Sequence, residues 1–208
     1  MSRVDDLADL VKTTNDILLV NEAQNVRTVY IQVDDLCELA LKSYLQANVD
    51  NWNPTDGVFR NGRPRFKRFW TVVKETRDEF PGNEQLSDLL DGFAARREER
   101  NSFFHDQNLS GLTVTSEKCL QALCDLYELL GVLFPDFWDK VEANSILKTQ
   151  MAVIRLKRRM WQDGSLNHRY QAILQRWRHG EDTEYLSVKG VALLRHPCLG
   201  YEFSVIYL

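Results

Sequence analysis

The stretch Val29-Tyr-Ile-Gln-Val-Asp-Asp-Leu-Cys-Glu-Leu-Ala-Leu-Lys-Ser-Tyr-Leu45 decides the fold class of this chain. Its apolar residues recur at steps of three and four positions: Val29, Val33, Leu36, Cys37, Ala40, Leu41, Tyr44 and Leu45. Such steps place side chains on one face of an α-helix. The pattern therefore predicts a helix that buries one apolar stripe against its neighbours.

Helical spacing continues on both sides of this stretch. A first helix is predicted from Val4, Leu7, Leu10, Val11, Ile17 and Leu18. Further helices are predicted over residues 68–80 and 84–107, and from Thr115 or Ser116 to about Phe134, where Pro135 ends the helix. Four or five helices joined by short connections favour a helical bundle.

Residues 51–66 interrupt the helical pattern. They hold two glycines and two prolines among turn-forming asparagines, so we expect a loop. The basic residues in and after this segment are Arg60, Arg63, Arg65, Lys67 and Arg68. They form a cluster that could line a substrate groove.

Charge divides the chain into two parts. Residues 1–140 carry 16 basic and 24 acidic side chains, whereas residues 141–208 carry 10 basic and 6 acidic ones. We therefore expect a bundle over residues 1–138 and a basic C-terminal extension over 139–208. The extension is predicted to contain a long helix from Ile146 to Trp161 and a shorter one from Tyr170 to Trp177, with a terminal β-hairpin of residues 187–194 and 201–207.

Composition excludes several classes of protein. With 44% hydrophobic and 27% charged residues, the chain is neither disordered nor membrane-spanning in character, and its net charge of -4 argues against a generally nucleic-acid-binding surface. The N-terminal residues are acidic and lack the basic flank of a signal peptide, so we expect a cytoplasmic protein. Cys37, Cys119, Cys124 and Cys198 are too sparse for a disulfide scaffold and lack metal-ligand spacing, and neither a metal nor a cofactor is expected.

The segment 84–107 carries the chemistry. Its apolar stripe, which includes Leu86, Leu90 and Phe93, continues at the same steps into Arg97, Arg100, Asn101, Phe104 and His105. An unpaired polar group on a buried face costs about 1 to 3 kcal/mol. A core stripe that turns polar therefore indicates a functional site.

Arg100-Asn101-Ser102-Phe103-Phe104-His105 resembles the Arg-Asn-x-x-x-His signature of the HEPN superfamily. The helix at residues 34–45 and the helix at residues 117–134 resemble those of the family more weakly. The resemblance implies a helical bundle, a homodimer with one composite active site, and metal-independent endoribonuclease activity. Toxins and phage-defence effectors are common roles in this family, and an antitoxin or another regulatory protein is an expected partner. Some toxin members carry Tyr two residues after the His, where this chain has Gln107, so regulation by modification of that Tyr is not expected.

The residue types suit RNA cleavage. Imidazole has an ordinary pKa of about 6.5, so His105 is the candidate to take the 2′-hydroxyl proton or to protonate the leaving 5′-oxygen. Arg100 is the candidate to hold the phosphate oxygens, and Asn101 to fix the imidazole or a phosphate. The resemblance implies products with a 2′,3′-cyclic phosphate and a 5′-hydroxyl. Candidate RNA-binding residues are Arg97, Arg63, Arg65, Arg155, Arg158 and Arg159.

Three alternatives stay open. The same polar patch could belong to a non-catalytic HEPN-like module that binds RNA, nucleotide or a partner protein. The basic extension could dock on the acidic first part instead of binding RNA. A DNA-binding regulator is a third alternative, although no helix-turn-helix pattern is present and the acidic first part would repel a duplex.

Overall fold

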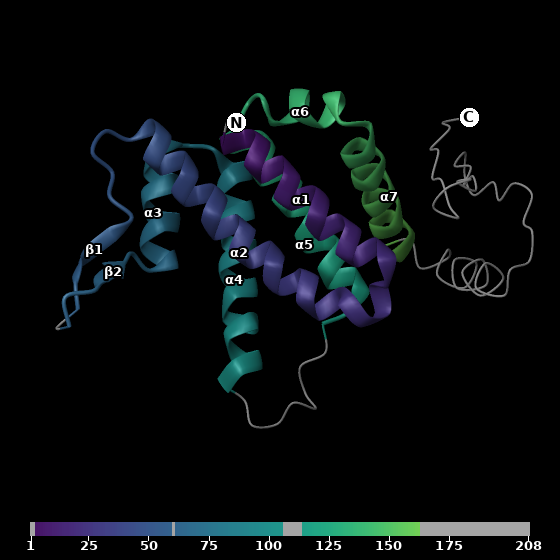
Figure 1. Ribbon diagram of the computed structural model, residues 1–208, viewed down its shortest axis with the longest axis horizontal. Helices are drawn as coiled ribbons and strands as arrows, with labels where there is room; N and C mark the ends of the chain where they lie inside the picture. The colour runs from purple at the N-terminus through teal and green to yellow at the C-terminus, as the bar shows by residue number, and fades with distance from the viewer. Residues whose placement is uncertain (1–2, 60, 106–113, 163–208) are drawn as a thin grey trace, which may run out of the picture.

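The computed structural model describes residues 3–59, 61–105 and 114–162 (Figure 1). The helices are α1 (Arg3–Val20), α2 (Glu22–Asn48), α3 (Phe69–Glu79), α4 (Glu84–His105), α5 (Ser116–Leu133), α6 (Phe137–Ala143) and α7 (Ser145–Gln162), and the strands are β1 (Thr55–Val58) and β2 (Pro64–Phe66). The described part is thus mainly helical, as the spacing over residues 29–45 predicted. None of its helices combines the length and the apolar character that crossing a bilayer requires.

Helix α5 lies at the centre of the bundle. Ten of its 18 residues are buried, among them Leu123, Leu126 and Tyr127. It packs against α2 and α7, and α1 packs against the same two helices. Each fully buried leucine contributes about 1.5 to 3 kcal/mol relative to an exposed one, so α5 supplies much of the stabilising apolar surface.

One hydrogen bond crosses this core. The hydroxyl group of Tyr127 in α5 donates to Oδ1 of Asn15 in α1 at 2.7 Å. Both residues are fully buried. The bond satisfies a hydroxyl group that would otherwise be costly to remove from water, and it fixes the register of α1 against α5.

Side-chain caps start α4, which carries the candidate motif, and α5, which follows it. Asn83 precedes α4, and its Oδ1 accepts from the backbone N–H of Leu86 at 2.9 Å. Thr115 precedes α5, and its hydroxyl oxygen accepts from the N–H of Lys118 at 3.2 Å. Both caps satisfy N–H groups that have no partner within the helix. The predicted start of the helix at Thr115 or Ser116 is confirmed.

The expectation of a loop over residues 51–66 was wrong in part, because β1 and β2 form an antiparallel hairpin there. The N–H of Phe59 donates to the carbonyl of Arg63, and the N–H of Gly62 donates to that of Phe59, both at 2.8 Å. Gly57 and Gly62 have positive φ angles of 88° and 77°. Glycine takes this conformation without strain, so the residues that suggested a loop instead form the bulge and the turn of the hairpin.

The described part of the C-terminal extension packs on the bundle. The boundary expected between residues 138 and 139 falls inside α6, which the sequence analysis did not predict. Leu147, Met151 and Ile154 of α7 belong to the same apolar core as α1 and α5. Trp138 of α6 lies against Gly131 of α5, where a Cβ atom would collide with the indole ring. The helix predicted at 170–177 and the strands predicted at 187–194 and 201–207 lie outside the described residues.

Candidate functional site

Helix α4 changes character along its length. Leu86, Leu90 and Phe93 are buried in the core, as the stripe predicted. One turn later, Arg96 pairs with Asp125 of α5, and its guanidinium group stacks on the Phe93 ring at 4.6 Å. Where the buried face of α4 becomes polar, the charged side chains are therefore stabilised by pairing with acids and not only by contact with solvent.

Arg97 and Arg100 of α4 converge on Asp34 of α2. The Nη1 atom of Arg97 lies 3.0 Å from Oδ2 of Asp34, and Nη1 of Arg100 lies 3.2 Å from the same oxygen. The side chain of Asp34 is only 2% exposed, and that of Arg100 is 18% exposed. A buried carboxylate between two guanidinium groups is stabilised where a single unpaired charge would be very costly.

Each of the two arginines also binds a second acid on α2. Nη2 of Arg100 donates to Oδ1 of Asp35 at 2.9 Å, and Nη2 of Arg97 lies 2.6 Å from Oε2 of Glu38. We call the set Asp34, Asp35, Glu38, Arg97 and Arg100 the α2–α4 charge cluster. Because three carboxylates of one helix meet two guanidinium groups of the other, the cluster fixes the position of α4 relative to α2.

Burial determines the protonation of this cluster. It raises the pKa of Asp34 to about 6, against the opposing charges of Arg97 and Arg100. Burial also acts to raise the pKa of Glu38, but its hydrogen bond from Lys42 and the charge of Arg97 outweigh this effect and lower that pKa. The pKa of Asp34 is therefore closer to neutral pH than that of Glu38.

A second set of contacts holds the helix one turn before its end. Glu99 accepts from the Tyr30 hydroxyl group at 2.8 Å and pairs with Lys118 of α5 at 2.5 Å. Burial and the hydrogen bond to Glu99 raise the pKa of Tyr30 well above its ordinary value, so this hydroxyl group stays protonated as a donor. The last part of α4 is thus bound to both α2 and α5.

The candidate catalytic residues all lie at the C-terminal end of α4. Arg100 takes part in the α2–α4 charge cluster, Asn101 is exposed, and His105 is the last residue of the helix. The side chain of His105 lies outside the described part of the chain. Figure 1 shows that this end of α4 projects past the other helices. Asn101 and His105 are four positions apart and hence neighbours along the helix surface.

Comparison of the chain with known protein families, curated proteins and solved structures gives no match. Among the described residues, no group of three or more His, Cys, Asp or Glu side chains is arranged to hold a metal ion.

The candidate RNA-binding arginines fall into three places. Arg97 belongs to the α2–α4 charge cluster. Arg63 and Arg65 are exposed on the hairpin, where Arg65 pairs with Asp56 at 3.1 Å. The remaining three lie on α7, which Figure 1 shows on the side of the bundle opposite the hairpin. The structure does not gather all six into one surface.

Two of the three α7 arginines contact the bundle. Arg155 donates to Glu128 at 2.8 Å and stacks on the Trp138 ring at 5.0 Å. Arg158 donates to the amide oxygen of Gln121 at 2.6 Å. Arg159 is exposed. The contacts of Arg155 and Arg158 are those expected if the described part of the extension docks on the first part of the chain.

Sequence reasoning missed the acids of α2 as partners of the motif. Asp34 lies directly after Val33 within the apolar stripe of α2, so its burial could have been inferred from its position. A buried acid on one stripe and arginines on another predict a pair between the two helices. Both halves of this signal are present in the sequence, at Asp34 and at Arg97 and Arg100.

Proposed function

We propose that this protein is a metal-independent endoribonuclease of HEPN type, which cleaves RNA by attack of the 2′-hydroxyl group on the adjacent phosphate. The observation that carries the proposal is the placement of Arg100, Asn101 and His105 on the final turns of one projecting helix. A homodimer that apposes two such helix ends would hold two copies of the motif in one groove. A role as a toxin or phage-defence effector follows from the HEPN resemblance.

Each residue has a distinct role in this mechanism. His105 removes the 2′-hydroxyl proton or protonates the leaving 5′-oxygen, because imidazole exchanges protons near neutral pH. Arg100 binds the phosphate oxygens as negative charge develops on them. Asp34 and Asp35 hold the Arg100 guanidinium group at this end of the helix, which limits the freedom lost when RNA binds. Asn101 is exposed and positions the imidazole or a phosphate oxygen.

The direct test is cleavage of end-labelled RNA by the purified full chain in EDTA. The expected products carry a 2′,3′-cyclic phosphate and a 5′-hydroxyl group, and DNA of the same sequence is not cut because it lacks the attacking hydroxyl. His105→Ala and Arg100→Ala should each lower the rate at least 100-fold. Full activity of both variants would overturn the assignment, and a strict requirement for Mg²⁺ would overturn the metal-independent mechanism.

Two controls separate chemistry from folding. His168→Ala changes a histidine outside the motif and should leave cleavage unchanged. Arg100→Lys keeps a positive charge beside Asp34 but loses the planar fork, so it should stay folded and still cleave poorly. Circular dichroism and thermal unfolding of every variant show whether a loss of activity reflects a loss of structure.

A non-catalytic HEPN-like module is the second candidate function. It is favoured by the engagement of Arg100 with both Asp34 and Asp35, which is what a purely structural arginine would show. This candidate predicts no RNA cleavage under any tested condition, and marked loss of stability in both Arg100→Ala and Arg100→Lys. Retained stability of Arg100→Lys together with lost cleavage would exclude it.

A further inference from the structure

The hairpin and the start of α3 combine basic and aromatic residues in an unusual density. Residues 58–70 contain five basic residues, four aromatic residues and no acidic residue. The net charge of the whole chain is -4. This short segment is therefore a local positive region within the acidic first part of the chain, residues 1–140.

Three of the four aromatic side chains are exposed. Phe59 is 53% exposed, Phe66 is 62% exposed and Trp70 is 50% exposed, and Val58, which precedes Phe59, is exposed as well. Single exposed apolar residues need no explanation, but large apolar side chains exposed together on the hairpin and on the adjoining start of α3 indicate a binding surface. Figure 1 shows the hairpin extending away from the helices.

The base of the hairpin is anchored to α3. Glu75 of α3 accepts from the Trp52 indole N–H and from Lys67, each at 2.7 Å. Lys67 also lies over the Trp52 ring at 5.0 Å. These contacts engage Lys67 but leave the arginines further along the hairpin at the surface. A binding surface that is already ordered loses less conformational entropy when a ligand binds.

The two faces of the hairpin differ in chemistry. Side chains alternate between faces along a strand, so Pro64 and Phe66 of β2 share one face while Arg65 lies on the other. Arg65 pairs with Asp56, but both side chains are more than half exposed, and such pairs contribute at most about 1 kcal/mol. A phosphate group can therefore replace Asp56 as the partner of Arg65.

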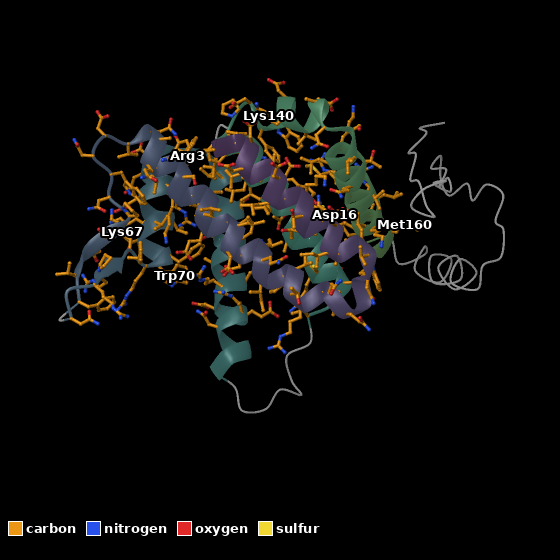
Figure 2. The ribbon with its side chains drawn as sticks, viewed as in Figure 1. Arg3, Asp16, Lys67, Trp70, Lys140 and Met160 are labelled. Atoms are coloured by element: carbon orange, nitrogen blue, oxygen red, sulfur yellow. The ribbon has the colours of Figure 1, made fainter. Side chains whose placement is uncertain are left out.

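Side-chain contacts connect the hairpin to the part of α4 that carries Arg97. Lys42 of α2 lies over the Phe66 ring at 5.7 Å and donates to Glu38 at 2.5 Å. Glu38 pairs with Arg97, whose guanidinium group lies over the Phe69 ring at 4.8 Å. Trp70 lies between the hairpin and α4 in the view of Figure 2. An unbroken series of contacts thus joins the hairpin to the α2–α4 charge cluster.

We propose that residues 55–70 form an arm that binds single-stranded RNA and leads it toward the end of α4, with bases stacked on Phe59, Phe66 and Trp70 and phosphates held by Arg63, Arg65 and Arg68. This inference builds on the proposed ribonuclease function and names its substrate class. Every unpaired base offers a π-face for stacking, whereas the bases of a duplex are already stacked. The absence of acidic residues from 58–70 favours a phosphate chain over a basic protein partner.

The test measures binding without cleavage. A fluorescein-labelled 20-nucleotide 2′-O-methyl RNA of mixed sequence lacks the attacking hydroxyl group, and its binding to the full chain is followed by fluorescence anisotropy. Phe59→Ala, Phe66→Ala and Trp70→Ala should each weaken binding about 5- to 150-fold, since stacking contributes about 1 to 3 kcal/mol per base. Arg63→Gln should weaken binding and reduce the salt slope by about 0.7, because one phosphate contact to a single strand is lost.

Control variants distinguish stacking from apolar docking. Ile146→Ala removes an exposed apolar side chain of α7 and should leave binding unchanged. Phe66→Tyr should bind as the wild type, whereas Phe66→Leu should bind as weakly as Phe66→Ala. Equal RNA affinity of Phe66→Leu and the wild type would show that no base stacks on Phe66 and would overturn the proposal. Equal affinity for a duplex of the same sequence would overturn it too.

The experiments distinguish a failure of the proposed arm from a failure of the proposed ribonuclease function. If the wild type binds the RNA and the aromatic variants do not, but no RNA is cleaved in EDTA, the arm stands and the ribonuclease function fails. If RNA is cleaved and Phe59→Ala, Trp70→Ala and Arg63→Gln keep the KM of the wild type, the ribonuclease function stands and the arm fails.

Discussion

Arg100 of α4 and Asp34 of α2 form an ion pair at 3.2 Å, and the carboxylate of Asp34 is almost fully buried. Arg97 binds the same carboxylate oxygen at 3.0 Å, so two guanidinium groups share one buried acid. The arginine that the HEPN resemblance assigns to catalysis is thus part of the contact between two helices. Stability and activity are expected to be coupled at this position.

Asp34 should make the stability of the fold depend on pH. Burial raises its pKa from an ordinary value of 3.8 to about 6, so the folded state binds the proton more tightly than the unfolded chain does. The resulting stabilisation is complete below about pH 4 and is lost as the pH rises through 6. Asp34→Asn lacks this titration. The free energy of unfolding of the wild type, taken relative to that of the variant, should therefore fall by about 2 kcal/mol from pH 4 to pH 6.5.

Urea denaturation of both proteins across this pH range measures the difference. Asp139→Asn, which changes an exposed acid on α6, serves as the control and should follow the wild type. A wild type that gains stability relative to Asp34→Asn as the pH rises would show that the arginines lower the pKa of Asp34 and would contradict the prediction.

Removal of the Tyr127 hydroxyl group should destabilise the bundle. Tyr127→Phe leaves the buried Asn15 side chain without the donor that lies 2.7 Å away, at a cost of about 1 to 3 kcal/mol. Tyr44→Phe changes a tyrosine that is less buried and should cost under about 0.5 kcal/mol. Thermal or urea unfolding measures both values, and equal stability of the two variants would argue against the role of this bond.

Ion pairs should hold α7 on the bundle. Lys157 lies 2.6 Å from Glu22 at a largely buried contact, so Lys157→Glu should destabilise the protein by about 1 to 3 kcal/mol. Adding Glu22→Lys should restore more than half of this loss. Lys148→Glu breaks an exposed pair with Glu142 and should have little effect. Failure of the exchanged pair to recover stability would show that the two residues do not act together.

Three cysteines should resist modification while the protein is folded. Cys37, Cys119 and Cys124 are free and buried, and burial raises the thiol pKa of Cys119 to about 12 and of Cys124 to about 11. Few thiolates exist at pH 8, and reagents cannot reach them. In a Cys198→Ser variant, a thiol reagent should label none of the three rapidly, and all three after denaturation. Rapid labelling of the folded variant would contradict the burial.

Elements with a long periodic sequence pattern were predicted correctly, and short elements were missed. The stripes of α2 and α5 are local and long, so helical periodicity predicted both helices and the capping Thr115 predicted where α5 starts. Helix α6 has only seven residues, too few for a periodic pattern, and the hairpin was hidden by glycines and prolines that are typical of loops.

The candidate site was predictable only in part. The motif on α4 could be read from consecutive residues, but its pairing with Asp34, Asp35 and Glu38 depends on how two distant helices pack. The exposure of Phe59, Phe66 and Trp70 could not be predicted either. Aromatic residues are more often buried, and only the packing of neighbouring elements shows that these three are not. Packing between elements decides both features, and no single segment contains that information.

The packing of α6 on α5 depends on the absence of a side chain at Gly131, because the Trp138 indole ring occupies the place of a Cβ atom. Glycine in the middle of a helix weakens it by about 1 kcal/mol relative to alanine, yet here alanine would drive the indole ring away from α5. Trp138 lies in α6, the short helix that leads to α7, and Leu147, Met151 and Ile154 of α7 belong to the core. A one-carbon addition in the interior of α5 would thus disturb the helix through which the chain returns to the core.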